Sequence, residues 1–515
     1  MTGRRLGPGR EHTCPDSGGS EGWCLRRASM AGMTVRAEWR IAYGSLSRLG
    51  GRALGAVVSL VALREATRYF GPLDWGPITA ALAWFGLFSG LGTPGVATLA
   101  MREIAGPDAD RGRALGRSLV ATGAVSAFAL VAAVVIGLPV YWTKGTTLEM
   151  MLVLALGLPA MAVFLTSSAA LAGRGRSDVR GLLDLVSSLL LLGATLVVVH
   201  GHEGQLGYAT AYLCYLVVAA VVAVGVAAWL VRPKLRGSLS GLRSQLRQAL
   251  PLSQLDLFTA AYARADSLML FFIRGSRPVA FYGVAFQMVT FLFVVPSLLS
   301  GALLPDYVTS TAERRRFLAR RGFDVMLTLA LPLPVFGILF GRALVVWIAG
   351  SRYAPAGTLF AILSGAGALA FLNGYLFQMA VFSGAEKGLW RSAAAVTVAN
   401  VAANVLAVTF FAATGAAVVM ILSELVGLAM YWRLYRASLP SPLGRRYPLS
   451  VAVATAAFAA LSAVLRFGLH VGSGSGAGIL PRGVALLAIY LVLVAGVAAT
   501  AKQVSTRMLP TAAGR

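Results

Sequence analysis

The sequence predicts an all-α polytopic membrane protein with about fourteen transmembrane helices, arranged as two lobes of about six helices with two further helices appended. Three observations lead to this prediction: the composition, the recurrence of long apolar runs, and the distribution of Lys and Arg between those runs. Apolar residues make up 57% of the 515 residues and charged residues only 13%, against about 25% charged residues in an ordinary soluble domain. Such a chain cannot cover a water-facing surface, so a soluble fold is excluded.

Residues 1–35 differ from the rest of the chain. They are rich in Gly, Ser and Arg and show no apolar periodicity, so we expect a disordered basic tail. No apolar region with a cleavage site follows them, and we therefore expect no signal peptide. Met30 and Met33 lie just before the first apolar run, and either is a candidate start of translation.

The helices are expected where apolar runs approach about 20 residues, the length that crosses the hydrocarbon core. The N-terminal lobe is expected at 41–231, a cytoplasmic linker at 232–248 and the C-terminal lobe at 249–435, with two appended helices within 448–501. The individual runs lie near 41–63, 78–100, 115–141, 149–172, 181–200, 207–231, 249–273, 279–304, 322–347, 357–383, 392–413, 415–432, 448–468 and 482–501.

Basic residues gather in alternate loops. Lys and Arg number 45 against 20 Asp and Glu. With the N-terminus in the cytoplasm, most of them fall in loops on that side, including Arg102, Arg174, Arg232 and the run Arg314–Arg316. This is the pattern of the positive-inside rule. We therefore expect both termini in the cytoplasm, and we interpret the basic excess as a topology signal rather than a nucleic-acid site.

Motifs that carry chemistry in enzymes do not occur. The chain has no GxxxxGK[ST] phosphate loop, no HExxH motif and no Cys/His metal spacing, and its loops are too short for a soluble catalytic domain. We therefore expect no enzymatic activity, no cofactor and no metal site. A membrane glycosyltransferase is the alternative from a different functional class.

Arginines in or beside the apolar runs are the candidate substrate-binding residues. An ionisable group at the centre of the bilayer costs about 2.5–3.5 kcal/mol on insertion scales, so such groups mark candidate sites. A guanidinium group binds phosphate through two parallel hydrogen bonds, which favours an anionic lipid-borne substrate over a cationic drug. The alternative for those near a helix end is that they reach the membrane interface. The candidates are Arg48, Arg52, Arg64, Arg68 and Arg264.

Acidic residues in the runs are the candidate ion-coupling residues, with a structural pair as the alternative. They are Asp256, Asp266 and Glu424. At 100° per residue, Arg264 and Asp266 lie about 80° to either side of Asp256. We therefore expect Asp256, Arg264 and Asp266 to face one cavity.

Uncharged polar and aromatic residues complete the expected site. Asn400 and Asn404 are one helical turn apart and are expected to offer hydrogen bonds to a polar cavity. Hydrogen bonding between helices is the alternative for this pair. Trp75 lies at a helix end, where we expect an anchor at the membrane interface.

Several stretches of the chain resemble one transporter family. The sequence RYFGPLDWG at Arg68–Gly76 resembles the signature that follows the first helix of polysaccharide flippases. These flippases belong to the multidrug/oligosaccharidyl-lipid/polysaccharide (MOP) exporter superfamily. The stretch Ser89–Ala105 is similar to the end of their second helix, and further positions match at Pro251, Arg264, Asp266, Tyr282, Pro305, Asn400, Asn404, Gly415 and Glu424. The resemblance covers residues 41–435, with Phe70 and Trp75 as departures from the signature.

This resemblance implies a transporter that flips a polyprenyl-pyrophosphate glycan across the bacterial inner membrane by alternating access. The implied partners are the lipid-linked glycan, membrane lipid, and a glycan polymerase or glycosyltransferases, with no nucleic acid. A proton or sodium gradient is the implied source of coupling, and the appended helices would flank a lipid portal. The alternatives are a lipid II flippase or a multidrug exporter of the same superfamily.

Overall fold

The computed structural model describes residues 50–92, 94–106, 110–234, 241–292, 311–382 and 386–438, with residues 452, 455–456 and 459–460. All regular elements within these ranges are helical, in agreement with the predicted fold class. The basic tail and nearly all of the two appended helices lie outside the described residues.

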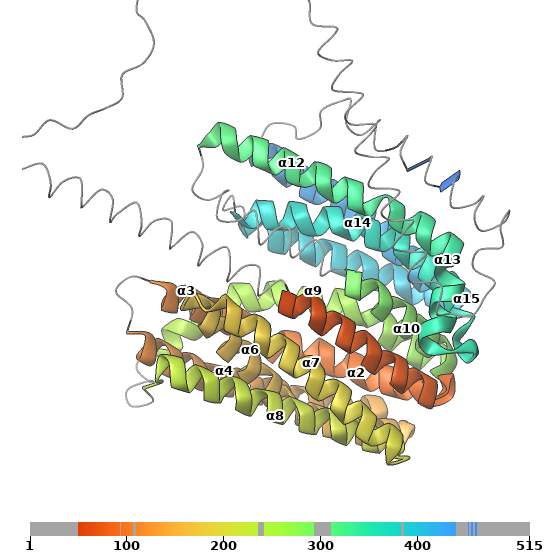
Figure 1. Ribbon diagram of the computed structural model, residues 1–515, viewed down its shortest axis with the longest axis horizontal. Coiled ribbons are helices and arrows are strands. Elements are labelled where there is room, and N and C mark those ends of the chain that lie inside the picture. Colours follow the sequence, from red (N-terminus) through yellow and green to blue (C-terminus); the bar gives the residue numbers. More distant parts are fainter. Residues whose placement is uncertain are drawn as a thin grey trace, which may run out of the picture.

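The first part of the chain forms a series of long helices. The first described helix covers residues 50–69. It is followed by α2 (Pro72–Gly92), α3 (Pro94–Ala105), α4 (Arg111–Tyr141), α5 (Thr146–Ala155), α6 (Leu158–Gly173), α7 (Ser177–His200) and α8 (Gln205–Val231) (Figure 1). The second part contains α9 (Leu242–Arg274), α10 (Ser276–Leu292), α12 (Ala312–Ala330), α13 (Pro332–Ala349), α14 (Ala356–Phe382) and α15 (Glu386–Ser438).

Some apolar runs contain two helical segments. Helices α2 and α3 meet at a bend of 44°, and α13 begins at Pro332, whose ring cannot continue the hydrogen bonding of α12. Helix α15 covers two predicted runs. Its backbone leaves the helical region at Ala412 (φ 51°, ψ −135°), which divides it into two helical parts. The boundary predicted between 413 and 415 therefore lies next to an actual turn.

Seven helical segments of the described chain are long and apolar enough to cross a membrane, or eight if α2 and α3 form one bent span. The chain is therefore a multi-pass membrane protein. The predicted number of about fourteen spans stays a prediction. Six predicted spans are not in this count: the first described helix, α9 and α10 are not counted, α15 counts once although it turns at Ala412, and the last two predicted spans lie almost wholly outside the described residues.

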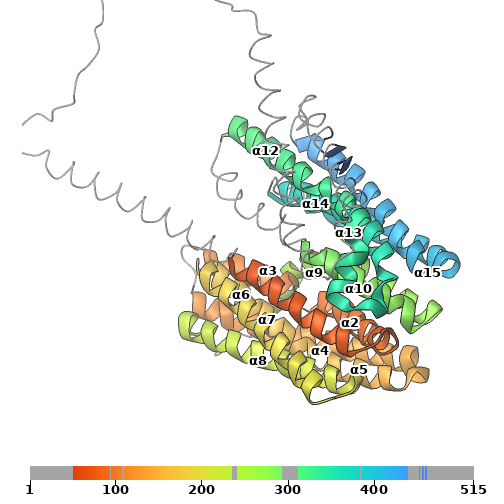
Figure 2. The same cartoon turned by 45° about the vertical axis from the view of Figure 1, so that its right-hand side comes forward.

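The helices pack as two groups with α9 and α10 between them (Figures 1 and 2). Helix α9 contacts α2 and α3 on one side and α15 on the other, and α10 contacts both α2 and α14. Glycines allow a close approach: a Cβ added at Gly90 would lie 2.4 Å from Ala260 Cβ, and one at Gly95 would lie 2.3 Å from the Ala249 oxygen. The lobe boundary at 232–248 stays a prediction, since α9 and α10 contact both groups.

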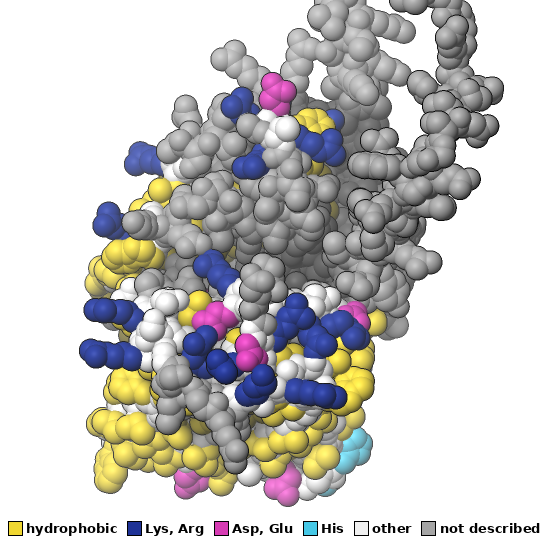
Figure 3. Space-filling view, turned by 90° about the vertical axis from the view of Figure 1, so that its left-hand side faces the viewer, with side chains coloured by type: hydrophobic (Ala, Val, Ile, Leu, Met, Phe, Trp, Pro, Cys, Tyr) yellow, Lys and Arg dark blue, Asp and Glu magenta, His cyan; other side chains and the backbone are white. Residues whose placement is uncertain are grey.

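One end of the bundle carries most of the described basic side chains. Figure 3 looks at this end, where Lys and Arg form a broad band. It contains the end of α3 and the start of α4, where Arg117 pairs with Glu103 at 3.0 Å. The end of α8 joins it, with Lys234 Nζ 3.2 Å from Asp110 Oδ2. We call it the basic end.

The opposite end is held by hydrogen bonds between segments distant in sequence. The Arg68 guanidinium group donates to the carbonyl oxygens of Trp347 at 2.7 Å and Ile348 at 3.3 Å, at the C-terminus of α13. The Tyr353 hydroxyl donates to the Phe70 carbonyl at 3.1 Å. We call these five residues the end clasp, because they connect the start of the chain to the α13–α14 junction.

Candidate functional site

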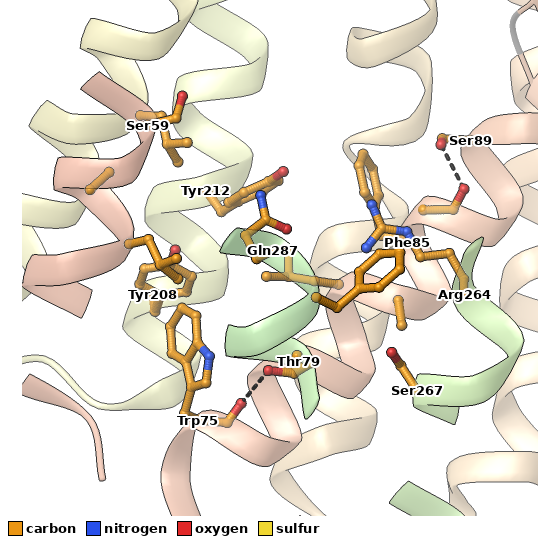
Figure 4. A pocket seen from close by; sticks show the side chains of 18 of the residues that line it. Ser59, Trp75, Thr79, Phe85, Ser89, Tyr208, Tyr212, Arg264, Ser267 and Gln287 are labelled. Carbon is orange, nitrogen blue, oxygen red and sulfur yellow. Dashed lines mark hydrogen bonds between the residues drawn. The ribbon is translucent and has the colours of Figure 1, made fainter. Parts of the chain in front are cut away.

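A cavity of about 310 Å³ lies between the N-terminal helices, α9 and α10 (Figure 4). The first helix and α2 contribute Ser59, Trp75, Thr79, Phe85 and Ser89, α8 contributes Tyr208 and Tyr212, and α9 and α10 contribute Arg264, Ser267 and Gln287. We call it the arginine cavity. Among the described residues that line this cavity, Arg264 is the only basic one, and none is Asp or Glu.

Arg264 reaches this cavity because α2 leaves room for it. A Cβ added at Gly86 would lie 2.7 Å from Arg264 Nε, so the glycine allows the guanidinium group to lie against α2. Arg264 forms no salt bridge with any residue in the described part of the chain. A partly buried cation without a carboxylate partner is free to pair with an anionic ligand.

Aromatic rings form much of the cavity wall. The Trp75 ring lies 6.3 Å from Phe70 in a stacked arrangement and 5.6 Å from Tyr208 in a T-shaped one. Trp75 is only 5% exposed. Its expected place as a membrane-interface anchor was wrong, because the signature turn directs it inward rather than toward lipid.

A second cavity, also of about 310 Å³, lies between α9, α14 and α15. Its polar lining residues are Asp256, Thr259, Tyr262, Asn373, Thr397, Ser423, Glu424 and Tyr431. Two of them are carboxylates, and no described Lys, Arg or His lines it. We call it the carboxylate cavity.

Glu424 is held in place at the wall of the carboxylate cavity. The Tyr262 hydroxyl donates to its Oε1 at 2.9 Å, and Asn373 Nδ2 donates to its Oε2 at 2.6 Å. Asn373 Nδ2 also lies 2.8 Å from the Glu424 carbonyl oxygen. The Asn373 Oδ1 atom is buried without a hydrogen-bond partner. The cavity therefore presents oxygen atoms suited to a proton or a hard cation.

The prediction that Asp256, Arg264 and Asp266 share one cavity was wrong. Asp256 lines the carboxylate cavity and Arg264 lines the arginine cavity. Asp266 lines neither of these two: it accepts hydrogen bonds from the Tyr282 hydroxyl and from the Ser267 backbone N–H. The reason is helical geometry: Arg264 and Asp266 are two residues apart and point about 160° away from each other, and Asp256 lies about 12 Å along the axis from Arg264.

Asn400 and Asn404 line neither cavity. Asn404 Nδ2 donates to Asn400 Oδ1 at 3.0 Å, and Asn400 Nδ2 donates to Ser423 Oγ at 2.9 Å. The Asn400–Ser423 bond connects the two parts of α15 on either side of Ala412. The pair therefore matches the alternative of hydrogen bonding between helices, and not the polar-cavity prediction.

The first-helix arginines do not join Arg264. Arg48 lies outside the described residues, and Arg52 is exposed. Arg64 lies 3.0 Å from Glu65, and Arg68 belongs to the end clasp. None of the three described arginines lines the arginine cavity.

Comparisons with known proteins agree with this architecture. A family model described as "Polysaccharide biosynthesis protein" matches residues 41–308, more than half of the chain. Among solved structures, lipid II flippase MurJ in its inward closed conformation has a TM-score of 0.69 at 11% identity, covering 88% of this chain and 98% of that one. No match was found among curated protein sequences.

Two further solved structures belong to the MOP superfamily by their descriptions. A transporter from Pyrococcus furiosus has a TM-score of 0.58 at 16% identity, covering 77% of this chain and 96% of that one. An inward-facing multidrug resistance MATE transporter has a TM-score of 0.59 at 16% identity, covering 76% and 98%. At such identities the likeness shows the fold, while the sequence match shows the family. The chain belongs to the polysaccharide biosynthesis protein family and has the fold of MOP-superfamily transporters.

Proposed function

We propose that this protein flips a polyprenyl-pyrophosphate-linked oligosaccharide across the cytoplasmic membrane by alternating access. The observation that carries the proposal is the arginine cavity, which holds one unpaired arginine and no described carboxylate. Arg264 pairs with the phosphates of the headgroup while the polyprenyl tail remains in lipid. The basic end faces the cytoplasm, following the positive-inside rule.

The carboxylate cavity supplies the coupling step. Asp256 and Glu424 take up a proton or sodium ion there, away from the anionic headgroup. A ligand shifts a conformational equilibrium only by its different affinity for the two states. Binding of the ion to the carboxylate cavity therefore drives transport only if the packing of α9, α14 and α15 differs between the two conformational states.

A lipid II flippase is the second candidate within the same superfamily. The lipid II flippase MurJ structure aligns with 88% of this chain, whereas the MATE transporter above aligns with 76%. A cationic-drug exporter is disfavoured because an arginine, and no described carboxylate, lines the first cavity. Both flippase candidates require a pyrophosphate site, so they differ in the glycan and not in the use of Arg264.

Proteoliposomes that contain a lipid-linked oligosaccharide with a labelled sugar would test the proposal. The label on the inner leaflet should become accessible to external periodate only when the protein is present, with the lipid chemically unchanged. Arg264→Ala should remove this activity, whereas the exposed Arg52→Ala is the matched control and should retain it. Size-exclusion profiles would verify folding of both variants.

Other results would redirect the assignment. Efflux of cationic dyes without lipid translocation would indicate a drug exporter. A chemically altered lipid would indicate an enzyme. Equal activity of Arg264→Ala and the wild type would show that Arg264 does not bind the substrate.

A further inference from the structure

The arginine cavity has two contrasting sides. Trp75 and Tyr208 lie on one side and Arg264 and Phe85 on the other, with Gln287 between them (Figure 4). Aromatic faces carry negative charge density that attracts polarised C–H groups. A pyranose ring has such C–H groups on its faces and hydroxyl groups around its edge. The cavity therefore offers an aromatic surface for a sugar beside a cation for a phosphate.

Polar groups on this wall have no partner among the described residues. The indole N–H of Trp75 and the side-chain amide of Gln287 form no hydrogen bond with the described part of the protein, although both line the cavity. Trp84, on the same helix, donates its indole N–H to the Ala133 carbonyl at 3.2 Å. Because both residues line the cavity, these donors are available to a ligand or water with acceptor oxygens.

We infer that the first sugar of the lipid-linked glycan occupies the arginine cavity between Trp75 and Arg264. Its C–H face lies against the aromatic wall, and its hydroxyl oxygens accept hydrogen bonds from Trp75 and Gln287. The volume of about 310 Å³ is at the lower end of small-ligand pockets, which fits one ring with its phosphate rather than a whole oligosaccharide. This inference rests on the proposed function and specifies which part of the substrate binds in the cavity.

Binding measurements on the full-length protein in nanodiscs would test this subsite. The probes are a polyprenyl pyrophosphate alone and the same lipid carrying one N-acetylglucosamine, glucose or galactose. At least one sugar should strengthen wild-type binding about tenfold, the effect of one good stacking contact with one or two hydrogen bonds. Trp75→Ala should abolish this gain, which is measured in each protein as the ratio of its affinities for the sugar-bearing and the sugar-free lipid.

Two smaller substitutions test the stacking contact and the hydrogen bonds separately, and they are less disruptive to folding than Trp75→Ala. Trp75→Phe keeps an aromatic ring but removes the N–H, and Gln287→Leu removes the amide, so each should lose part of the gain. Trp84→Phe is the matched control, because Trp84 does not line the cavity, and it should keep the full gain.

The outcomes separate this inference from the proposed function. If no sugar strengthens wild-type binding, or if Trp75→Ala and Gln287→Leu keep the full gain, the sugar subsite is wrong. Binding of the sugar-free lipid that still depends on Arg264 would then leave the proposed function standing. A wild-type protein that binds neither form of the lipid would overturn both.

Discussion

The two cavities have similar volumes, yet their chemistry is opposite. Each measures about 310 Å³. The arginine cavity has Arg264 and no described carboxylate, whereas the carboxylate cavity has Asp256 and Glu424 and no described basic residue. Helix α9 contributes to both, since Arg264 and Asp256 lie on different faces of it. In the proposed function, this helix separates a site for an anion from a site for a cation.

This separation has a physical advantage. A carboxylate beside the phosphate site would repel the headgroup and would pair with Arg264 in its absence. With Asp256 on another face of α9 and Glu424 on α15, neither carboxylate lines the arginine cavity. We propose that movement of α9 couples the two sites, because α9 packs on both α2 and α15.

Reversing the charge of the arginine cavity should have the largest effect. Arg264→Glu should weaken binding of a polyprenyl pyrophosphate by at least about 100-fold, because an attractive charged pair becomes a repulsive one. Arg264→Lys should keep part of the affinity, since it retains the charge but loses the planar fork. Binding titrations in nanodiscs would measure both. Equal losses for Lys and Glu would show that charge is not what Arg264 contributes.

Neutralising the carboxylate cavity should affect coupling and spare headgroup binding. Glu424→Gln keeps the size of the side chain and its proximity to Tyr262 and Asn373. We expect transport driven by an imposed proton or sodium gradient to fall about tenfold or more, with pyrophosphate affinity changed less than about twofold. Proteoliposome transport with and without a gradient would check this. A gradient response equal to that of the wild type would exclude Glu424 as a carrier.

Crowding Arg264 should produce an intermediate effect. The Cβ of Gly86→Ala would lie 2.7 Å from Arg264 Nε, so the guanidinium group must move. We expect about a five- to tenfold loss of pyrophosphate affinity, because a displaced guanidinium group forms poorer hydrogen bonds. The exposed Gly225→Ala is the control, since open space surrounds it. Unchanged affinity of Gly86→Ala would mean that Arg264 tolerates this displacement.

The end clasp should alter conformation more than ligand affinity. Arg68→Gln removes charged hydrogen bonds to Trp347 and Ile348, each worth about 1.5–3 kcal/mol when intact and less where solvent reaches it. We expect faster labelling of a cysteine introduced at Ala356, which is fully buried at the start of α14 and is not part of the end clasp. Labelling rates with a membrane-impermeant thiol reagent would measure opening, in a background in which Cys14, Cys24 and Cys214 are all replaced by Ser. An unchanged rate would show that Arg68 does not hold this end closed.

A change outside both cavities should affect only stability. The backbone N–H of Arg113 and the ammonium group of Lys234 hold the pKa of Asp110 below its ordinary value. The stabilisation is therefore present above the ordinary aspartate pKa and is lost as pH falls through the lower folded-state value. Asp110→Asn should slightly lower the melting temperature at pH 7, with a smaller difference at acid pH. An equal difference at both values would contradict this electrostatic origin.

The helices could be predicted because their cause is local. Long apolar runs require helices in lipid, so the boundary near Ala412 could be predicted from the run lengths, whereas the break at Pro332 lies inside one predicted run, 322–347. The candidate site was harder, because it depends on which helices become neighbours. Arg68 meets carbonyls of α13, and Trp75 turns inward to Tyr208. Neither contact can be predicted from the residues adjacent to it in the sequence.

The placement of basic and acidic residues in different cavities could be predicted in part from the sequence. Residues two apart on a helix point in nearly opposite directions, so the spacing of Arg264 and Asp266 already argues against a shared cavity. The aromatic wall also has a sequence signal, because Tyr208, Tyr212 and Tyr215 follow one face of α8. Whether such a face meets lipid or a cavity depends on packing, which the periodicity alone does not specify.

The separation of anion and cation sites can be measured directly by comparing three proteins with one ligand. Binding of a polyprenyl pyrophosphate would be titrated with the wild type, Arg264→Ala and Glu424→Gln in nanodiscs at one salt concentration. The account predicts that Arg264→Ala raises the Kd about 10- to 100-fold, while Glu424→Gln leaves it within about twofold. Equal losses in both variants, or a loss confined to Glu424→Gln, would contradict it.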